Sequence, residues 1–383
     1  MRFSEIASSR RQQVKQTLPA IALAQFVDQE QEQDMQEQKL SGVTARPFDE
    51  PELTAYLDRT IGRDKQKQDR FQRPYIHASN VPIVDEQGRR YDLDALKSQI
   101  TTRPDKILKQ NEKMVHSDGS EQVFFNVSLP ALKGLAVDES TGKFVIIDTC
   151  PGAGSCKTFC YALKGGYVQW KAVSLSQTKM LNFLYNDPTG FMEKLSQEID
   201  KQKNKFAKKN VKVAIRWHDA GDFFSQHYLD LAFGVARNHP DVDFYAYTKI
   251  AGVAQQQRPD NFIINFSMGA QRREEKKIDF VKTKHSKVVP RELFYDLIKR
   301  DGNRLIKDSK GRMQFDSPAA LSTFKTRMAQ EYNIDPGTIL THDEMLAKPK
   351  SAERNKYNVI VMPGDGDSSA NRADVLGSYL LIH

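Results

Sequence analysis

The chain has few cysteines and no long apolar run. Its 383 residues include three cysteines, and an odd number of closely spaced thiols argues against a disulfide framework. No stretch approaches the roughly 20 consecutive apolar residues that cross a bilayer, and the N-terminus MRFSEIASSRRQQVKQ lacks the apolar core of a signal peptide. We therefore expect a cytoplasmic protein with reduced thiols, which favours metal or redox chemistry.

Hydrophobic residues are also scarce, at 39% of the chain with a mean hydropathy of −0.61, whereas positive charge is abundant. From Gln271 to Met313, fourteen Lys/Arg residues stand against seven acidic residues, and the run KQKNKFAKKNVK from Lys201 has six lysines and no acid. This charge suits DNA or RNA, although a solvated helical face has the same composition. The candidate nucleic-acid contacts are Arg272, Arg273, Lys276, Lys277, Lys282 and Lys284.

The pattern along the chain predicts four regions. Residues 1–70 contain the tract DQEQEQDMQEQKL, which predicts a polar extension, partly disordered or helical, with one short helix that Asp49 caps. Residues 71–270 predict the main part of an α/β barrel. Residues 271–355 interrupt the strand–helix rhythm and predict a basic helical insertion, and residues 356–383 predict the C-terminal barrel strands and helix.

Short apolar strands alternate with amphipathic helices in the central region. Asp187 and Pro188 begin a helix in which Phe191, Leu195 and Ile199 form an inward stripe. The expected strands include KFVIID, VKVAIRW, VDFYAY, FIINF and NVIVMP. This alternation describes repeated βαβ units and a parallel sheet, and about six strands suit a complete or partial (β/α) barrel.

Polar residues or thiols follow five of these strands, at the point where each strand ends. Chemistry in barrels gathers in the loops after the C-terminal strand ends, although polar loops also occur without a site. The candidates are Cys150, Cys156 and Cys160 after KFVIID; His218, Asp219, Gly221 and Asp222 after VKVAIRW; Lys249 after VDFYAY; Ser267 after FIINF; and Asp365, Asp367, Asn371 and Arg372 after NVIVMP.

All three cysteines lie in one glycine-rich loop, CPGAGSCKTFC, which follows a predicted hairpin that turns at residues 140–142. Three thiolates can hold three corners of an iron–sulfur cluster and leave the fourth iron open. Gly152 and Gly154 would let the loop wrap tightly around the cluster. Two alternatives remain, namely tetrahedral zinc with His218 as fourth ligand and three reduced thiols packed as small hydrophobes.

This loop, which ends in CYA and follows an apparent first barrel strand, resembles the radical S-adenosylmethionine superfamily. AGDFFS (220–225) is similar to the glycine-rich GGE segment of that superfamily, and YTK (247–249) and NFS (265–267) resemble its third and fourth strand ends. CPGAGSCKTFCYA, RWHDAGDFFS and YAYTK also resemble the uncharacterised gene-product-88-like phage proteins. The spacing CxxxxxCxxxC departs from the CxxxCxxC that is usual in the superfamily. The resemblance implies a [4Fe-4S] cluster on the cysteines, with S-adenosylmethionine near Asp222 and Ser267.

Several candidates have both a functional and a structural interpretation. Asp222 can hold a ligand amine or act as a base, or it can cap the helix that begins near Ser225. His218 can bind metal or move protons, or it can be a structural residue beside Trp217. Lys249 can contact an anion or extend to solvent. The catalytic candidates are Asp222, Asp219, His218 and Lys249, and the cofactor-binding candidates are Gly221, Asp222, Ser267, Asp365, Asp367, Asn371 and Arg372.

Together these features predict a phage-type metalloenzyme that uses a [4Fe-4S] cluster and S-adenosylmethionine to modify a nucleic acid or nucleotide, in the cytoplasm of an infected host cell. One alternative resembles the deazaguanine transglycosylases, with Asp219 or Asp222 as nucleophile and zinc held by the cysteines and His218. A second alternative is a non-enzymatic nucleic-acid-binding protein whose metal only fixes the fold. The sequence does not distinguish DNA from RNA or define an oligomeric state.

Overall fold

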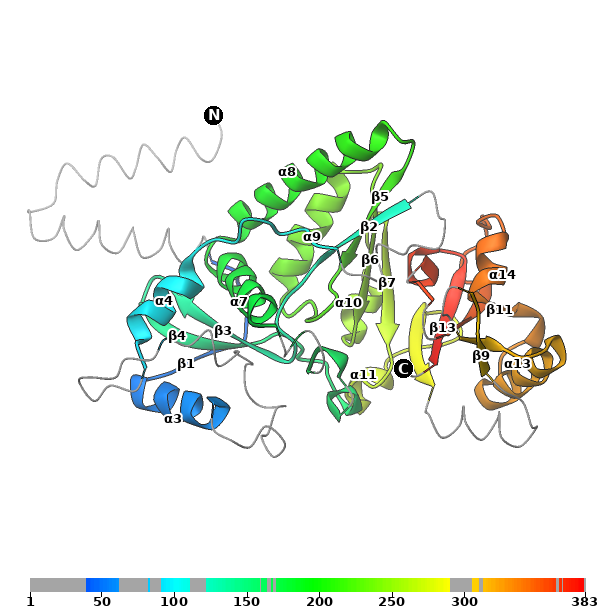
Figure 1. The fold of residues 1–383 in the computed structure, drawn as a ribbon, viewed down its shortest axis with the longest axis horizontal. Coiled ribbons are helices and arrows are strands. Elements are labelled where there is room, and N and C mark those ends of the chain that lie inside the picture. Colours follow the sequence, from blue (N-terminus) through cyan, green and yellow to red (C-terminus); the bar gives the residue numbers. More distant parts are fainter. Residues whose placement is uncertain are drawn as a thin grey trace, which may run out of the picture.

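The centre of the molecule is a parallel sheet of eight strands in the order β11-β12-β13-β8-β7-β6-β5-β2 (Figure 1). The structure is a computed structural model that describes residues 39–61, 82, 91–110, 122–158, 160–163, 167, 170–289, 305–309, 313–362, 365–366 and 368–381. All neighbouring strands pair in parallel, which confirms the predicted α/β class. The strands are β2 (Gln122–Val127), β5 (Lys212–Trp217), β6 (Asp243–Thr248), β7 (Phe262–Ser267), β8 (His285–Val289), β11 (Ile339–Thr341), β12 (Tyr357–Val361) and β13 (Val375–Leu381).

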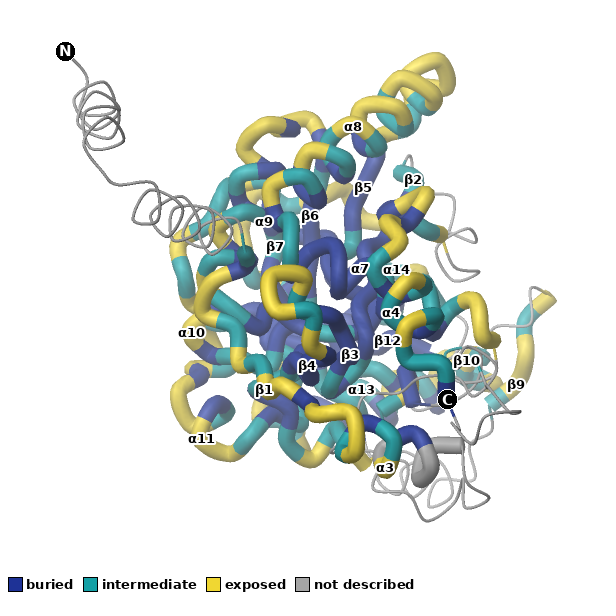
Figure 2. The backbone as a smooth tube through the Cα atoms, turned by 90° about the vertical axis from the view of Figure 1, so that its left-hand side faces the viewer, coloured by how far each residue is buried: buried dark blue, intermediate teal, exposed yellow. Residues whose placement is uncertain are grey.

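Helices cover one face of this sheet. They are α7 (Lys171–Asn186), α8 (Pro188–Ala207), α9 (Gln226–Asn238) and α10 (Ala251–Gln255). Trp217, Phe244 and Phe262 come from three neighbouring strands, their rings contact one another, and each is at most 2% exposed. Figure 2 shows the strands in the buried colour, with exposed turns of α8 and α10 around them. The main hydrophobic core therefore lies between this face and the helices.

Helix α8 forms where the sequence predicts it. Asp187 is the N-cap and accepts a backbone hydrogen bond of 2.8 Å, and Pro188 lies in the first turn. Phe191, Leu195 and Ile199 are 0% exposed, so the predicted inward stripe is confirmed. Burial of each such side chain contributes about 1.5–3 kcal/mol, which fixes the helix on the sheet.

The opposite face carries a short 3-10 turn, η5 (Ser368–Asn371), and is called the η5 face below. Asn371 donates a hydrogen bond of 3.2 Å to Gln122 at the start of β2. β2 and β11 stand at the two ends of the strand order and do not pair with each other in the part of the chain that the structure describes. A closed barrel is therefore not shown. Ala370 packs against one residue from each of three strands, Phe124, Ala214 and Tyr245.

A second, antiparallel sheet has the order β1-β4-β3. Its strands are β1 (Ala45–Pro47), β3 (Lys133–Asp138) and β4 (Lys143–Asp148), and α3 (Glu50–Ile61) and α4 (Leu93–Thr101) pack with it. The predicted hairpin is confirmed, with Gly142 at a φ of 66°. The predicted helix start at Asp49 is also confirmed. Two expectations are wrong: KFVIID is β4 of this sheet and no barrel strand, and residues 39–61 belong to the packed fold.

The segment 271–355 is no separate helical insertion, because β8 and β11 within it belong to the large sheet. It also contributes α11 (Arg272–Glu275), the two-stranded sheet of β9 (Leu305–Lys307) and β10 (Met313–Phe315), α13 (Pro318–Tyr332), η4 (Pro336–Thr338) and α14 (His342–Ala347). The sequence misplaced these strands because they are only three to five residues long. Among the described residues, no helix is long and apolar enough to span a membrane.

Candidate functional site

The loop that carries the cysteines, residues 150–163, lies across the ends of β6 and β7. It contains the 3-10 turns η2 (Ser155–Thr158) and η3 (Tyr161–Leu163). The backbone N–H groups of Gly154 and Cys156 both donate to the carbonyl oxygen of Gly269, at 3.1 and 3.0 Å. The loop thus leaves β4 of the antiparallel sheet and reaches the C-terminal edge of the parallel sheet.

Two glycines permit this contact. A β-carbon on Gly154 would lie 2.0 Å from the carbonyl oxygen of Ala270, and one on Gly152 would lie 2.4 Å from that of Lys249. Contacts under 3.0 Å are essentially never made by real β-carbons. These glycines are therefore required for the backbone of the loop to approach the strand ends. From the sequence alone, they are expected instead to let the loop wrap around a cluster.

The three thiols gather around one small apolar group, formed by Leu132, Ala153 and Leu163. The Leu132 N–H donates to Cys150 Sγ at 3.3 Å, and the Leu163 N–H donates to the carbonyl oxygen of Cys160 at 3.2 Å. Burial raises the pKa of Cys150 and of Cys160, and the negative charge of Asp222 and of the neighbouring thiols raises that of Cys150 further. Burial therefore disfavours the thiolate forms of Cys150 and Cys160.

Asp222 and Lys249 tie the loops after β5, β6 and β7 together beside these thiols. Asp222 is 3% exposed and accepts hydrogen bonds from the N–H groups of Phe223 and Lys249, at 2.7 and 2.8 Å. Burial raises the pKa of Asp222 to about 6, against these bonds. The Lys249 ammonium donates to Ser267 Oγ at 2.7 Å and to the Ser267 and Met268 carbonyls, so it does not extend to solvent.

The structure excludes one of the predicted roles of Asp222 and one of those of His218. Ser225, and not Asp222, caps α9. His218 is 3% exposed and its Nε2 lies 2.7 Å from the Tyr228 hydroxyl, within the aromatic core of the helical face. Burial, helped by the charge of Arg216, lowers the His218 pKa to about 3. The structure thus does not place His218 with the cysteines as a fourth zinc ligand. Gly221, at a φ of 90°, leaves only 2.9 Å between a would-be β-carbon and Leu129.

The site also includes Tyr161, Tyr167 and Arg216, which the sequence did not single out, beside the predicted Asp219 and Tyr247. Asp219 Oδ2 accepts a hydrogen bond of 2.9 Å from the Tyr167 hydroxyl, and the Tyr167 ring contacts that of Tyr161. Arg216 lies 3.5 Å from the Tyr161 hydroxyl and stacks over the Tyr247 ring at 5.0 Å. The sequence did contain a signal for this group. Arg216 pairs in register with Tyr245 of the next strand, and Tyr247, two residues further along that strand, lies on the same face of the sheet.

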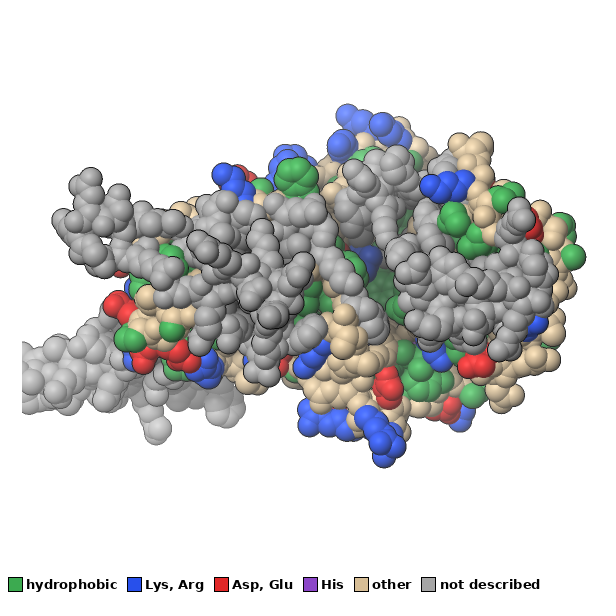
Figure 3. All heavy atoms as spheres, turned by 60° about the horizontal axis from the view of Figure 1, so that its bottom comes forward, with side chains coloured by type: hydrophobic (Ala, Val, Ile, Leu, Met, Phe, Trp, Pro, Cys, Tyr) green, Lys and Arg blue, Asp and Glu red, His purple; other side chains and the backbone are tan. Residues whose placement is uncertain are grey.

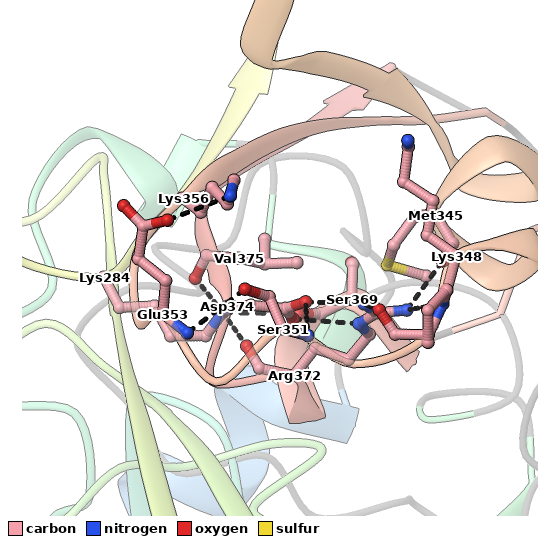
Figure 4. Close-up of polar contacts among 11 residues, drawn as sticks. Lys284, Met345, Lys348, Ser351, Glu353, Lys356, Ser369, Arg372, Asp374 and Val375 are labelled. Carbon is pink, nitrogen blue, oxygen red and sulfur yellow. Dashed lines mark hydrogen bonds and ion pairs between the residues drawn. The ribbon is translucent and has the colours of Figure 1, made fainter.

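The candidates from the C-terminal region lie elsewhere. Arg372 is 5% exposed and bonds to Asp374 at 2.6 and 2.9 Å and to the carbonyls of Met345, Lys348 and Pro349 (Figure 4). Asn371 bonds to Gln122. Both residues precede β13, and Asn371 contacts the first residue of β2, so they lie at the N-terminal edge of the sheet, opposite the cysteines. Asp365 closes a local turn through a 2.8 Å bond from Met362 N. Asp367 lies outside the described residues.

Five of the six basic candidates form an exposed patch, called the basic patch below: Arg272, Arg273, Lys276, Lys277 and Lys282. The patch adjoins the cysteine loop, since Gln271 bonds to Gly152 O and Pro151 O. Figure 3, which looks onto this end, shows clustered Lys and Arg side chains. Lys284 is 6% exposed and donates to the carbonyls of Ser369, Arg372 and Val375, so it is no surface contact.

The donor chemistry of the cysteine loop fits an iron–sulfur cluster. Three thiols can hold three corners of such a cluster, and Cys150 accepts an N–H···S bond, as cluster ligands commonly do. Among the described residues, no group of three or more His, Cys, Asp or Glu is arranged to hold a metal ion. The identity of the donors, and not their arrangement, therefore suits a cluster.

The fold and the site define an α/β protein with a cysteine loop at the C-terminal edge of a parallel sheet. The chain belongs to the family described as Gene product 88, whose model matches residues 105–331. It is 34% identical over 124 residues to the Gene 88 protein of Mycobacterium phage L5, across 31% of this chain and 52% of that protein. The match thus spans about half the length of that relative. No solved structure matches.

This family assignment confirms the predicted likeness to gene-product-88-like phage proteins and leaves the radical S-adenosylmethionine likeness a prediction. The matched range contains the cysteine loop, Asp222, Lys249 and Ser267. Asp365, Asn371 and Arg372 fall outside it, as they also lie apart from the cysteines in the fold.

Proposed function

We propose that this protein is an iron–sulfur enzyme that binds a [4Fe-4S] cluster through Cys150, Cys156 and Cys160 and modifies a nucleic acid or nucleotide with S-adenosylmethionine. The observation that carries the proposal is the gathering of all three thiols around Leu132, Ala153 and Leu163 beside the ends of β6 and β7. When bound, the cluster supplies the electron that splits S-adenosylmethionine and starts hydrogen abstraction from the substrate.

The protein groups around the thiols have separate tasks. The N–H···S bond from Leu132 to Cys150, at 3.3 Å, stabilises negative charge on that sulfur. Burial raises the pKa of Cys160 and of Asp222, and the nearby Lys249 ammonium opposes this rise. Asp222 links the loop after β5 to the loop after β6 through the hydrogen bond that it accepts from the Lys249 N–H. A bound cluster would supply the positive charge that the thiolates need.

The basic patch supports a nucleic acid as the substrate. Arg272, Arg273, Lys276 and Lys277 are all exposed. Glu274 Oε1 forms ion pairs with two of them, at 3.6 Å to Arg273 Nε and 3.1 Å to Lys277 Nζ. Because Gln271 joins this segment to the cysteine loop, phosphates bound here would lie beside the thiols. The ring of His218 packs in the helical-face core, which counts against the zinc site of the transglycosylase alternative.

Metal content and visible absorbance of full-length protein purified without oxygen test the proposal. About four irons per chain and a broad absorbance band in the visible are expected, with S-adenosylmethionine cleavage on reduction. Cys156→Ser should lose most of the iron, whereas Thr158→Ala, an exposed position in the same turn, should retain it.

Three outcomes would contradict the proposal. One zinc per chain and no colour would indicate a structural or catalytic zinc. A protein without metal, in which Cys156→Ser and Thr158→Ala behave alike, would indicate packed thiols. A cluster that is present but never cleaves S-adenosylmethionine would reduce the site to a structural metal centre, as in the non-enzymatic alternative.

A further inference from the structure

A group of polar and aromatic side chains lies on the η5 face, next to the cysteine loop. Side chains alternate along a strand, so Asn126 lies on the same face as Phe124, Arg216 as Ala214, and Tyr247 as Tyr245. Arg216 pairs in register with Asn126 and stacks over the Tyr247 ring at 5.0 Å. Tyr161 follows Cys160 directly. We call this group the tyrosine–arginine cluster: Asn126, Tyr161, Tyr167, Arg216, Asp219 and Tyr247.

The floor of the cluster contains two buried side-chain oxygens that lack a hydrogen-bond donor among the described residues, and the charge of Asp219 acts on the nearby Lys109 ammonium. Asp219 is 8% exposed, and its Oδ2 accepts from Tyr167, but its buried Oδ1 has no partner among the described residues. Asn126 is 2% exposed, and its Oδ1 also lacks a partner in the described chain. The two lie close together, since Asp219 N bonds to Val127 O at 3.3 Å. A buried acceptor without a donor is costly, so these oxygens point to a ligand that donates.

The rim of the cluster is aromatic and partly open to solvent. Tyr161 is 52% exposed and packs edge-on against Tyr167 at 5.6 Å. Burial raises the pKa of Tyr167, so its hydroxyl stays protonated and donates to Asp219. Tyrosine rings and a guanidinium plane are surfaces on which nucleobases stack.

The shape of the cluster and its unpaired acceptors select among planar ligands. A carboxylate is an acceptor only, so it favours a base edge with adjacent N–H donors over one that mixes donors and acceptors. Guanine has such an edge, with an imino N–H beside an amino group. Adenine and cytosine present an amino group beside a ring acceptor, and uracil presents one N–H between two carbonyls. The floor therefore favours guanine.

We propose that the tyrosine–arginine cluster binds a guanine base, which Asp219 recognises through its N–H donors and which stacks on the tyrosine rim. This inference rests on the proposed function, because it names the substrate group of the same site, although base binding can be measured without turnover. Asp219 and Asp222 lie in one loop after β5, so a base held by Asp219 lies next to the cysteine pocket.

Isothermal titration calorimetry of the full chain, purified without oxygen, tests this inference. The probes are the 5′-monophosphates of guanosine, inosine, cytidine and uridine, and single-stranded oligonucleotides with and without one guanine. Guanosine monophosphate should bind tightest. Inosine monophosphate lacks the amino group and should bind about tenfold more weakly. A preference for guanine in either the free nucleotide or the oligonucleotide supports the inference and shows which form the site takes.

Matched variants locate the binding. Asp219→Asn should weaken guanosine monophosphate at least about tenfold, because the new amide N–H₂ opposes the base donors. Tyr167→Phe, which keeps the carboxylate but removes the bond that orients it, should weaken it less. Asp230→Asn is the control, since Asp230 is exposed on α9 and accepts a hydrogen bond from Gln226 one turn before it. Circular dichroism melting checks that each variant is folded.

Four results would overturn the inference. These are equal affinity for the guanosine and uridine nucleotides, full competition by inorganic phosphate, equal binding by Asp219→Asn and Asp230→Asn, and no nucleotide or oligonucleotide binding by folded protein. Iron content of the same samples separates the two proposals. Normal iron content without base selectivity refutes only the guanine site. Base selectivity without iron refutes only the iron–sulfur cluster.

Discussion

Replacing Gly154 by alanine should detach the cysteine loop from the sheet. The new β-carbon would lie 2.0 Å from the carbonyl oxygen of Ala270 and 2.4 Å from its carbon. Both are backbone atoms and cannot rotate away, so the loop must shift by about 1.5 Å to restore an ordinary contact. Gly234→Ala is a matched control, because nothing lies within 4 Å of the β-carbon there.

The expected cost follows from the bonds that such a shift breaks. Three backbone hydrogen bonds hold the loop, two of them to Gly269 O, at 3.1 and 3.0 Å, and one from Gln271 N to Gly152 O, at 2.8 Å. At about 1 kcal/mol each, their loss costs roughly 3 kcal/mol. For a chain of 383 residues, this lowers the melting temperature by roughly 4 °C. Gly234→Ala, inside α9, should be stabilising by about 0.5–1 kcal/mol.

Thermal unfolding by circular dichroism and iron analysis together measure both consequences. Gly154→Ala should melt earlier and hold less iron than the wild type, whereas Gly234→Ala should match or exceed it in both. If Gly154→Ala melted within about 2 °C of the wild type and kept its iron, the contact between the loop and the strand end would not matter as argued. A loss of stability without a loss of iron would refute only the link to the metal site.

The N-terminal edge of the sheet yields two further predictions. Arg372→Met should cost about 3–5 kcal/mol in urea denaturation because it leaves buried Asp374 unpaired, while Arg354→Met, at an exposed pair with Asp260, should change little; equal effects would contradict the buried network. Burial lowers the pKa of Lys284 from 10.5 to about 7, so the unfolded chain binds more protons between these pH values and the free energy of unfolding should rise with pH there. Lys284→Met should flatten that rise, and an unchanged slope would disprove the assignment.

Local signals predicted the helices well. The cap at Asp187, the proline after it and the stripe of Phe191, Leu195 and Ile199 all act within a few turns of one helix, so the sequence contains the whole argument for α8. The hairpin at 140–142 is equally local. The likeness to the gene product 88 family was also readable, because it rests on short contiguous motifs.

Strand pairing was less predictable, because it depends on partners far along the chain. KFVIID reads as a parallel strand by composition, but it pairs with β1 and β3 in an antiparallel sheet. From the sequence, the segment before Arg372 is expected to be a loop at the C-terminal edge of the sheet, beside the cysteines. In the structure the chain crosses the η5 face there and begins β13 at the N-terminal edge. Polar residues after a strand therefore indicated the site at β5, β6 and β7 and misplaced Asn371 and Arg372.

The turn η5 imposes an order on folding during synthesis. Gln122 and its partner Asn371 are 249 residues apart, and Ala370 covers Phe124, Ala214 and Tyr245. Until residue 370 has left the ribosome, the η5 face of β2, β5 and β6 has no such cover. Contacts of this sequence separation form slowly, and exposed apolar strands are prone to aggregate meanwhile. The nascent chain should therefore depend on chaperone protection longer than its early helices alone would suggest.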